Sequence, residues 1–334
     1  MEDTLLEVRD LQVEFSTKMG IVRVLDKVNL KVDPRQTVGI IGESGCGKSM
    51  MALSIMGLVP IPPGRIAGGE ILYCGTDLLT LEKDAILDIR GKRIAMIFQE
   101  PMNSLNPVFT VGNQLVETLL RHEDMTRRDA WDKSVDMLKA VGIPSPEKRM
   151  HDYSFQMSGG MRQRVMIAMS LCLDPDILIA DEPTTALDVT VQAQILDLLR
   201  EMQDRVGASI IMITHDLGVV AQMCEKIAVM YAGHIVEYGT TDEIFYQPGH
   251  EYTKGLINSI PKLNTEVRER LVPIEGTPVD LLNPPAGCPF APRCKNCMKI
   301  CLSKMPPRTE LSDTHYTYCW LQQKAAFEKG EKAE

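Results

Sequence analysis

The chain has 334 residues and a formal net charge of -9 at pH 7, with 44% hydrophobic and 24% charged residues. This length allows two domains, or one large domain with an appendage, and the composition is ordinary for a soluble globular protein. The acidic balance argues against nucleic acid as the main partner, because phosphate neutralisation needs clustered Lys and Arg.

Nothing in the sequence predicts a membrane span or a secretory signal. The longest apolar runs, such as residues 165–173, have the length of a core helix. The first residues, MEDTLLEVRD, are acidic and lack the basic and apolar regions of a signal peptide. We therefore expect a cytosolic protein, in which stable disulfides are rare.

Strands are predicted first. Residues 5–15 alternate apolar and polar side chains, the period of a half-buried strand, and residues 28–32 repeat this alternation. The run TVGII at residues 37–41 predicts a fully buried strand of a parallel sheet. The chain therefore begins as a β-rich region.

Helices are predicted over residues 110–169, and an α/β pattern then resumes. A strand is expected at 176–180, a helix at 191–207 and another strand at 209–214. Further on, Thr240 and Glu243 fit a capping box that opens a short helix.

The amino-acid composition changes after about residue 261, where prolines and cysteines become frequent. Eight prolines fall between 273 and 307, which excludes mainly helix or sheet. We place a domain boundary near Ser259. Residues 1–259 would form one domain, with a helical subdomain at about 100–170, and residues 260–334 a Pro- and Cys-rich extension.

The segment GESGCGKS, residues 42–49, fits the pattern G-x-x-x-x-G-K-[ST] directly after the predicted strand 37–41. Its glycines let backbone N–H groups point at phosphate oxygens, and the following helix would direct its positive end there. Lys48 is expected to reach the β and γ phosphates, and Ser49 to ligate Mg²⁺. The residues predicted to bind nucleotide in this phosphate loop are Gly42, Glu43, Ser44, Gly45, Cys46, Gly47, Lys48, Ser49 and Met50.

A second part of the predicted site lies in ILIADEP, residues 177–183. Four apolar residues predict a buried strand from whose carboxyl end Asp181 emerges, and α/β sheets bind their ligands at such ends. Asp181 is therefore expected to hold Mg²⁺. Glu182 is well placed to take a proton from attacking water.

With these ordered motifs, the chain resembles the ATP-binding subunits of ABC transporters over about residues 5–260. MSGGMRQR resembles the family signature, with Met161 in place of the usual Gln. In the family this signature faces the γ-phosphate bound by a second subunit, which assigns that role to Ser158, Gly159 and Gly160. The resemblance implies a homodimer or a heterodimer with a similar ATPase. It also implies an α/β fold, a P-loop NTPase core with an antiparallel β subdomain and an inserted helical subdomain.

The resemblance also assigns single residues. Gln99 matches a residue that touches Mg²⁺ and the attacking water, and it begins the segment that meets the membrane subunits. His215 matches the histidine that hydrogen-bonds the γ-phosphate, and Asp188 matches the loop that crosses the dimer interface. Phe15 matches the aromatic ring that stacks on adenine, although an alternating strand also needs aromatic core residues.

Transport is the expected use of the ATP. Repair ATPases of this superfamily carry long coiled-coil insertions, and translation ATPases carry two nucleotide domains, whereas this chain has one phosphate loop and one signature. The family implies docking on two membrane permease subunits at the cytoplasmic face of the membrane, as a peripheral protein, with an extracytoplasmic substrate-binding protein as an indirect partner. A soluble, non-transport ABC ATPase is the alternative.

The C-terminal part narrows the resemblance to the oligopeptide/dipeptide importer ATPases. The segments YQPGHEYTKGLINSIP (246–261) and GCPFAPRC (287–294) carry this likeness. Peptide import is therefore the expected function. Nickel and glutathione importers share the branch and remain alternatives.

Cys288, Cys294, Cys301 and Cys319 match the cysteine positions of that branch, some members of which bind a [4Fe–4S] cluster. The C-x-x-C-x-x-x-C spacing that includes Cys297 also favours iron–sulfur, with Cys297 as an alternative ligand. Zinc is the alternative metal, since four thiolates make a closed tetrahedral site. Reduced cysteines without metal are the third reading.

Overall fold

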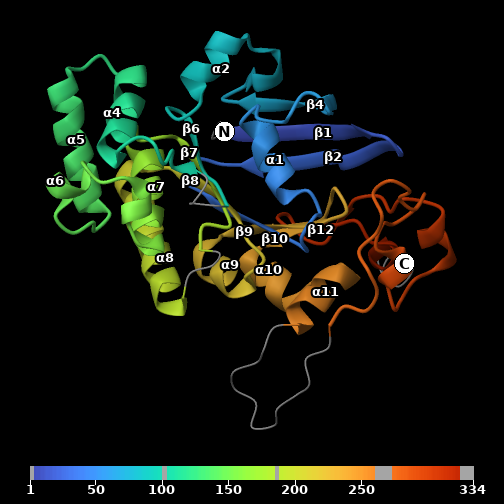
Figure 1. The fold of residues 1–334 in the computed structure, drawn as a ribbon. Coiled ribbons are helices and arrows are strands. Elements are labelled where there is room, and N and C mark those ends of the chain that lie inside the picture. Colours follow the sequence, from blue (N-terminus) through green and yellow to red (C-terminus); the bar gives the residue numbers. More distant parts are fainter. Residues whose placement is uncertain (1–3, 100–103, 185–187, 260–272, 324–334) are drawn as a thin grey trace, which may run out of the picture. The chain divides into compact units, whose positions relative to one another are not determined.

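The computed structural model describes residues 4–99, 104–184, 188–259 and 273–323 (Figure 1). It is a mixed α/β structure that divides into two compact units, each assembled from separate parts of the chain. Unit 1 comprises Met1–Leu5, Val32–Thr37 and Leu78–Ile213. Unit 2 comprises Leu6–Lys31, Val38–Asp77 and Thr214–Glu334.

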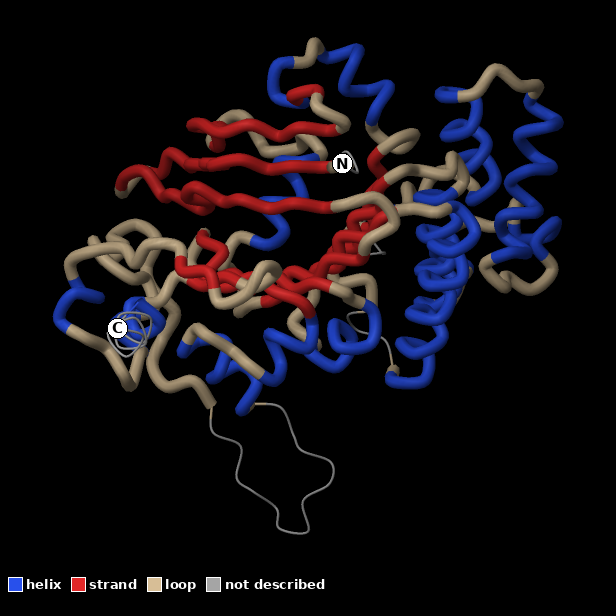
Figure 2. Tube along the Cα trace, turned by 180° about the vertical axis from the view of Figure 1, so that it is seen from behind, coloured by secondary structure: helices blue, strands red, loops and turns tan. Residues whose placement is uncertain are grey.

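One sheet of unit 2 is built from the N-terminal strands. In the order β2-β1-β4-β5 these are Gly20–Val32, Leu6–Thr17, Gly64–Tyr73 and Thr76–Asp77. The predicted alternation is confirmed in two stretches of β1, residues 6–8 and 11–13, which a register irregularity between Arg9 and Gln12 separates. It does not extend to Phe15, which is half-buried beside the buried Glu14. The long strands run side by side as red tubes near the N label in Figure 2.

Strands from both ends of the chain meet in a second sheet of unit 2. β3 (Thr37–Ile41), buried at every residue and with the bounds predicted, pairs in parallel with β9 (Lys226–Tyr231). β10 (His234–Thr240) lies antiparallel to β9, and β12 (Tyr316–Thr317) lies antiparallel to β10. The outermost strand is β11 (Thr309–Glu310).

Four helices complete the regular structure of unit 2 in the described residues. They are α1 (Lys48–Ile55), α9 (Leu217–Met223), α10 (Thr241–Tyr246) and α11 (Glu251–Asn258). The predicted capping box is confirmed at α10. Thr240 accepts a hydrogen bond from the backbone N–H of Glu243, whose carboxylate accepts one in return.

Unit 1 holds a parallel sheet in the order β8-β7-β6, formed by Ser209–Ile213, Ile177–Asp181 and Ile94–Ile97. Its described helices are α2 (Lys83–Ile89), α4 (Val111–His122), α5 (Arg127–Ala140), α6 (Pro146–Arg149), α7 (Gly159–Leu171) and α8 (Val189–Val206). Thr110 and Thr126 cap α4 and α5 by accepting backbone hydrogen bonds. The predicted helical character of residues 110–169 is thereby confirmed.

Residues 273–323 have little regular structure, as their proline content predicted. The elements described there are two 3₁₀ turns, Ala291–Arg293 and Lys299–Leu302, the two-residue strands β11 and β12, and a helical stretch over residues 320–323. Within the described parts of the chain, no helix combines the length and the apolarity needed to cross a membrane.

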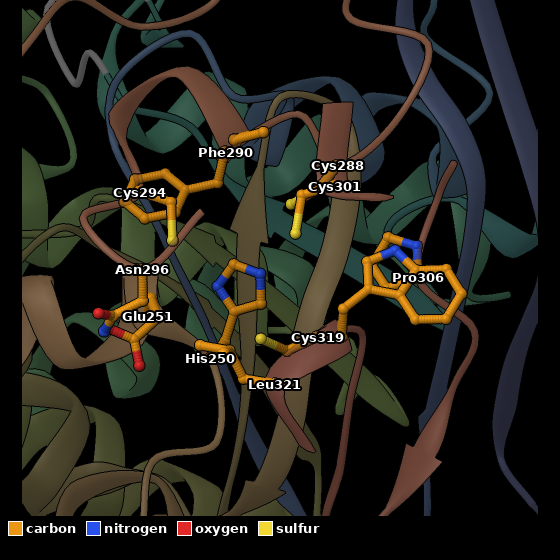
Figure 3. A pocket seen from close by; sticks show the side chains of 12 residues that line it. His250, Glu251, Cys288, Phe290, Cys294, Asn296, Cys301, Pro306, Cys319 and Leu321 are labelled. Carbon is orange, nitrogen blue, oxygen red and sulfur yellow. The ribbon is translucent and has the colours of Figure 1, made fainter. Parts of the chain in front are cut away.

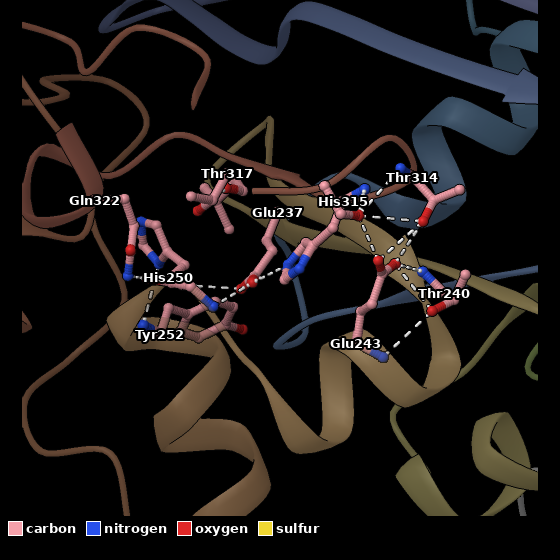
Figure 4. A network of polar contacts seen from close by, with 12 residues as sticks. Glu237, Thr240, Glu243, His250, Tyr252, Thr314, His315, Thr317 and Gln322 are labelled. Atoms are coloured by element: carbon pink, nitrogen blue, oxygen red, sulfur yellow. Dashed lines mark hydrogen bonds and ion pairs between the residues drawn. The ribbon is translucent and has the colours of Figure 1, made fainter. Parts of the chain in front are cut away.

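Glu237 of β10 joins this C-terminal segment to the rest of unit 2 (Figure 4). Its fully buried carboxylate accepts hydrogen bonds from the backbone N–H groups of Gly249 and His250, and lies 2.8 Å from Nε2 of His315. Burial lowers the pKa of His250 to about 4. A buried carboxylate with three partners holds the turn before α11 and the segment before β12 on one strand.

Candidate functional site

The phosphate loop connects β3 to α1 and closes around the side chain of Lys48. The Lys48 ammonium donates hydrogen bonds to the carbonyl oxygens of Gly42 at 2.8 Å and Glu43 at 3.0 Å. Gly42 has a φ of 154°, and a Cβ there would lie 2.1 Å from the carbonyl oxygen of Met230. This position therefore requires glycine.

Helix α1 presents a bare N-terminus to the loop. Its N-cap, Gly47, has a φ of 109° and offers no side-chain hydrogen bond, and the first turn contains no acidic residue. Ser49 and Met50 lie in that turn. The N–H groups and the positive end of the helix dipole can therefore bind phosphate oxygens.

In unit 1, Asp181 and Glu182 lie at the carboxyl end of β7, as predicted. Asp181 is 3% exposed. Glu182 has a φ of 47°, a strained conformation of the kind that collects at functional sites. Nε2 of Gln99 donates to Oε2 of Glu182 at 2.9 Å, so the structure brings two of the predicted residues into contact.

The signature segment forms the N-terminus of a second helix, α7. Ser158 caps α7 by accepting a hydrogen bond from the backbone N–H of Met161 at 3.3 Å. A Cβ on Gly159 would meet nothing within 4 Å, and the first turn is free of acidic residues. The start of α7 is thus open to an anion.

The other predicted residues lie at ends of elements or on strands. Asp188 caps α8 by accepting from the N–H of Val191 at 3.0 Å. His215 follows β8 and is exposed. Phe15 is half-buried in β1 opposite Gly64 of β4, where a Cβ would lie 3.0 Å from the ring.

Sequence reasoning missed Gln163, a buried side chain of α7. Its amide nitrogen donates to the carbonyl oxygen of Pro183 at 2.6 Å, which ties the signature helix to the segment after Glu182. The available sequence signal was a Gln on the same face of the predicted helix as apolar residues. Such a side chain is expected to be buried and to need a hydrogen-bond partner.

Comparison with known proteins identifies this arrangement. A family model described as "ABC transporter" matches residues 25–185, and one described as "Oligopeptide/dipeptide transporter, C-terminal region" matches residues 236–301. The oligopeptide transport ATP-binding protein OppD of Bacillus subtilis is 52% identical over 317 residues, which cover 95% of this chain and 88% of that protein. The dipeptide transport ATP-binding protein DppD of the same organism is also 52% identical, over 97% of this chain and 96% of its own length.

The chain belongs to the ATP-binding subunits of ABC transporters, in the oligopeptide/dipeptide branch. It is therefore an ATP-hydrolysing enzyme. A solved structure agrees with the fold: the ATP-binding cassette MJ0796, a dimer bound to ADP and Pi, has a TM-score of 0.63 and 26% identity. The match covers 71% of this chain and 98% of that one.

The branch-specific part of this ABC subunit contains a cavity lined by His250, Glu251 and residues of the C-terminal segment (Figure 3). Cys288, Cys294, Cys301 and Cys319 all line it, and Figure 3 shows their sulfur atoms turned toward a common space beside His250. The structure thus brings together the four cysteines that the resemblance grouped. His250 is an additional lining residue that the sequence did not suggest.

Three of the four cysteines that line the cavity are buried, and Cys294 is half-buried. Burial raises the pKa of Cys288 to about 12 and that of Cys294 to about 11. Cys297 is exposed and does not line the cavity. Within the described residues, no group of three or more His, Cys, Asp or Glu side chains is arranged to hold a single metal ion.

Proposed function

We propose that this ABC subunit hydrolyses ATP to power the import of dipeptides or oligopeptides through a membrane permease. The observation that carries the proposal is the identity of 52% with two peptide-transport ATP-binding proteins over almost the whole chain, C-terminal region included. The division into a nucleotide-binding domain at 1–259 and an extension at 260–334 belongs to the same proposal.

Lys48 and Ser49 hold the phosphates and Mg²⁺, and Asp181 and Gln99 complete the metal coordination. Glu182 acts as the general base that accepts a proton from the attacking water. The contact between Gln99 and Glu182 supports this division of roles, because it puts the amide and the carboxylate side by side, where both can hydrogen-bond the same attacking water. His215 senses the γ-phosphate, and Phe15 stacks on adenine.

The signature residues serve the nucleotide of a second ATPase subunit, identical or similar. Ser158, Gly159 and Gly160 support this role by leaving the start of α7 open. Asp188 belongs to the loop that crosses the dimer interface. Two such chains would sandwich the nucleotide and separate after hydrolysis.

Unit 1 offers apolar surface for two permease subunits at the cytoplasmic face of the membrane. The exposed apolar residues Phe98, Val108 and Phe109 lie in and beside the segment that begins at Gln99, and Phe155 is also exposed. Exposed aromatic groups of this kind mark protein contacts. An extracytoplasmic binding protein would deliver the peptide to those permeases.

The cysteine cavity suits a [4Fe–4S] cluster better than zinc. Zinc needs four sulfurs within about 2.3 Å of one point, whereas a cluster takes one thiolate on each of several irons and so tolerates wider spacing. Four cysteines around one cavity support the cluster. It would supply a cross-link and one-electron redox chemistry to a segment with few apolar residues.

The test couples hydrolysis to uptake. Glu182→Gln, in cells whose peptide importer has this chain as its ATPase, should lower ATP turnover by at least about 100-fold while ATP binding persists. Labelled peptide uptake should fall in parallel, and Glu201→Gln, an exposed change on α8, should leave both unchanged. Turnover near wild type in Glu182→Gln would refute the base assignment. If Glu182→Gln abolished nickel uptake and left peptide uptake unchanged, the assignment of peptides as the substrate would be refuted.

A further inference from the structure

The cysteine-rich extension contacts the phosphate loop directly through Arg293. This residue ends the turn Ala291–Arg293, next to the cavity residue Cys294. Its Nη1 lies 2.5 Å from Oε2 of Glu43, and its Nη2 lies 2.9 Å from Oε1. The Arg293 side chain is 4% exposed and that of Glu43 26%. Such a two-pronged, shielded ion pair is stronger than a surface pair and weakly screened by salt.

The guanidinium is fixed by other contacts as well. It donates to the hydroxyl of Tyr231 at 3.3 Å and to the carbonyl oxygens of Ile274 and Glu275 at 3.3 and 3.0 Å. The hydrogen bond with Glu43 is the largest cause of the raised pKa of Arg293. Because these three hydrogen bonds fix the Arg293 guanidinium independently of Glu43, we expect the guanidinium to determine where the Glu43 carboxylate lies.

The backbone of Glu43 in turn contacts Lys48, the lysine expected to bind the phosphates. Its backbone N–H donates to the hydroxyl of Tyr252 at 2.8 Å, and its carbonyl oxygen accepts from the Lys48 ammonium at 3.0 Å. Phe290 of the extension packs on Tyr252 and Tyr231, with ring centroids 5.4 and 5.3 Å apart. The extension therefore supports both the side chain and the backbone of one phosphate-loop residue.

Charge gives the pair a second effect. The phosphate loop binds an anion, so a carboxylate in it repels the ligand unless a cation compensates the negative charge. Arg293 supplies that cation. Removing Arg293 alone would leave the Glu43 carboxylate uncompensated beside the phosphates, whereas removing both charges would not.

We propose that Arg293 is a positioning residue for the phosphate loop, and that the cysteine-rich extension sets the affinity for ATP through it. The inference rests on the proposed role of residues 42–49 in ATP binding. Arg293 acts through Glu43, so it changes the Kd and KM for ATP and leaves kcat at saturating ATP nearly unchanged.

The experiment is a double-mutant cycle on the full-length chain. Binding of MgATP is measured by calorimetry for wild type, Arg293→Met, Glu43→Gln and the double variant. Arg293→Met should weaken binding by about tenfold, the effect of losing a charge-assisted hydrogen-bonded pair, and the double variant should recover most of this loss. The matched control is Lys295→Met, two residues after Arg293. It removes an exposed ion pair with Glu275 and should bind MgATP like wild type.

Unchanged binding in Arg293→Met, or additive losses in the double variant, would overturn the inference. If Arg293→Met fails to fold, Arg293→Lys takes its place, because it keeps the charge and loses the two-pronged geometry. Weaker binding without a change in kcat supports the inference in that variant, and unchanged binding refutes it. Wild type that binds no MgATP would overturn the proposed function itself, an outcome distinct from any pattern among the variants.

Discussion

In the phosphate loop the backbone holds the shape, whereas in the cysteine-rich extension side chains hold it. The loop relies on glycines at positive φ and on carbonyl oxygens that accept from Lys48. The extension relies on the side chain of Arg293 and on the carboxylate of Glu237. The loop should therefore be sensitive to any added Cβ, and the extension to the loss of individual functional groups.

The largest effect is expected from Gly42→Ala. The new Cβ would lie 2.1 Å from the carbonyl oxygen of Met230, so the loop must move away from its binding geometry. We expect MgATP affinity, measured by calorimetry, to fall by at least about 100-fold. Gly68→Ala on β4, where the nearest atom is 3.5 Å away, is the control. Normal ATP binding by Gly42→Ala would contradict the claim that the phosphate loop depends on its backbone conformation.

A smaller effect on ATP, and a large one on metal content, is expected from Cys288→Ser. If the proposed cluster is bound, the substitution removes one of its four thiolates, and iron in anaerobically purified protein should fall from about four atoms per chain to less than one. The exposed Cys74, outside the cavity, provides the control Cys74→Ser. Iron content unchanged in Cys288→Ser, or absent from wild type, would contradict the cluster.

The smallest effect concerns Glu243, which joins α10 to the extension. Burial would raise its pKa, but hydrogen bonds from Ser312, Thr240 and Thr314 outweigh burial and lower the pKa from its usual 4.5 to about 2. Its contribution to stability is therefore complete above about pH 4.5 and is lost as the pH falls toward 2.

Urea unfolding between pH 6 and 2 tests this sign. Glu243→Gln should be less stable than wild type near neutrality, and the difference should shrink as the pH falls below about 4.5. The neighbouring exposed Asp242→Asn should show no such convergence. A stability difference that stays constant across this range would show that the carboxylate is not stabilised by the extension.

Local patterns predicted the fold where a single element carried the signal. β3 has the predicted bounds, α4 begins and ends with its apolar periodicity, and the capping box at Thr240 is present. The strand expected at 176–180 is observed one residue later and places Asp181 at its end. Gln99 and Glu182 were each assigned to the site separately, and no pattern in the sequence predicted their contact across 83 residues.

Contacts between distant residues could not be predicted in this way. Arg293 and Glu43 are 250 residues apart, and His315 and Glu237 are 78 apart, so no periodicity or motif links them. Arg293 in particular is one of many charged residues in a polar segment. Its burial and its two-pronged geometry become visible only when the extension is folded.

The two-residue strand β12 has a consequence for how copies of this chain behave toward one another. It pairs with Glu237 and Tyr238 at the middle of the outer edge of β10, and the strand beyond it, β11, is only two residues long. Uncovered strands template association with other chains, whereas very short outer strands do not. The extension is therefore expected to reduce edge-to-edge aggregation of the sheet. A chain cut after Asn258 would lack β11 and β12 and should aggregate more readily.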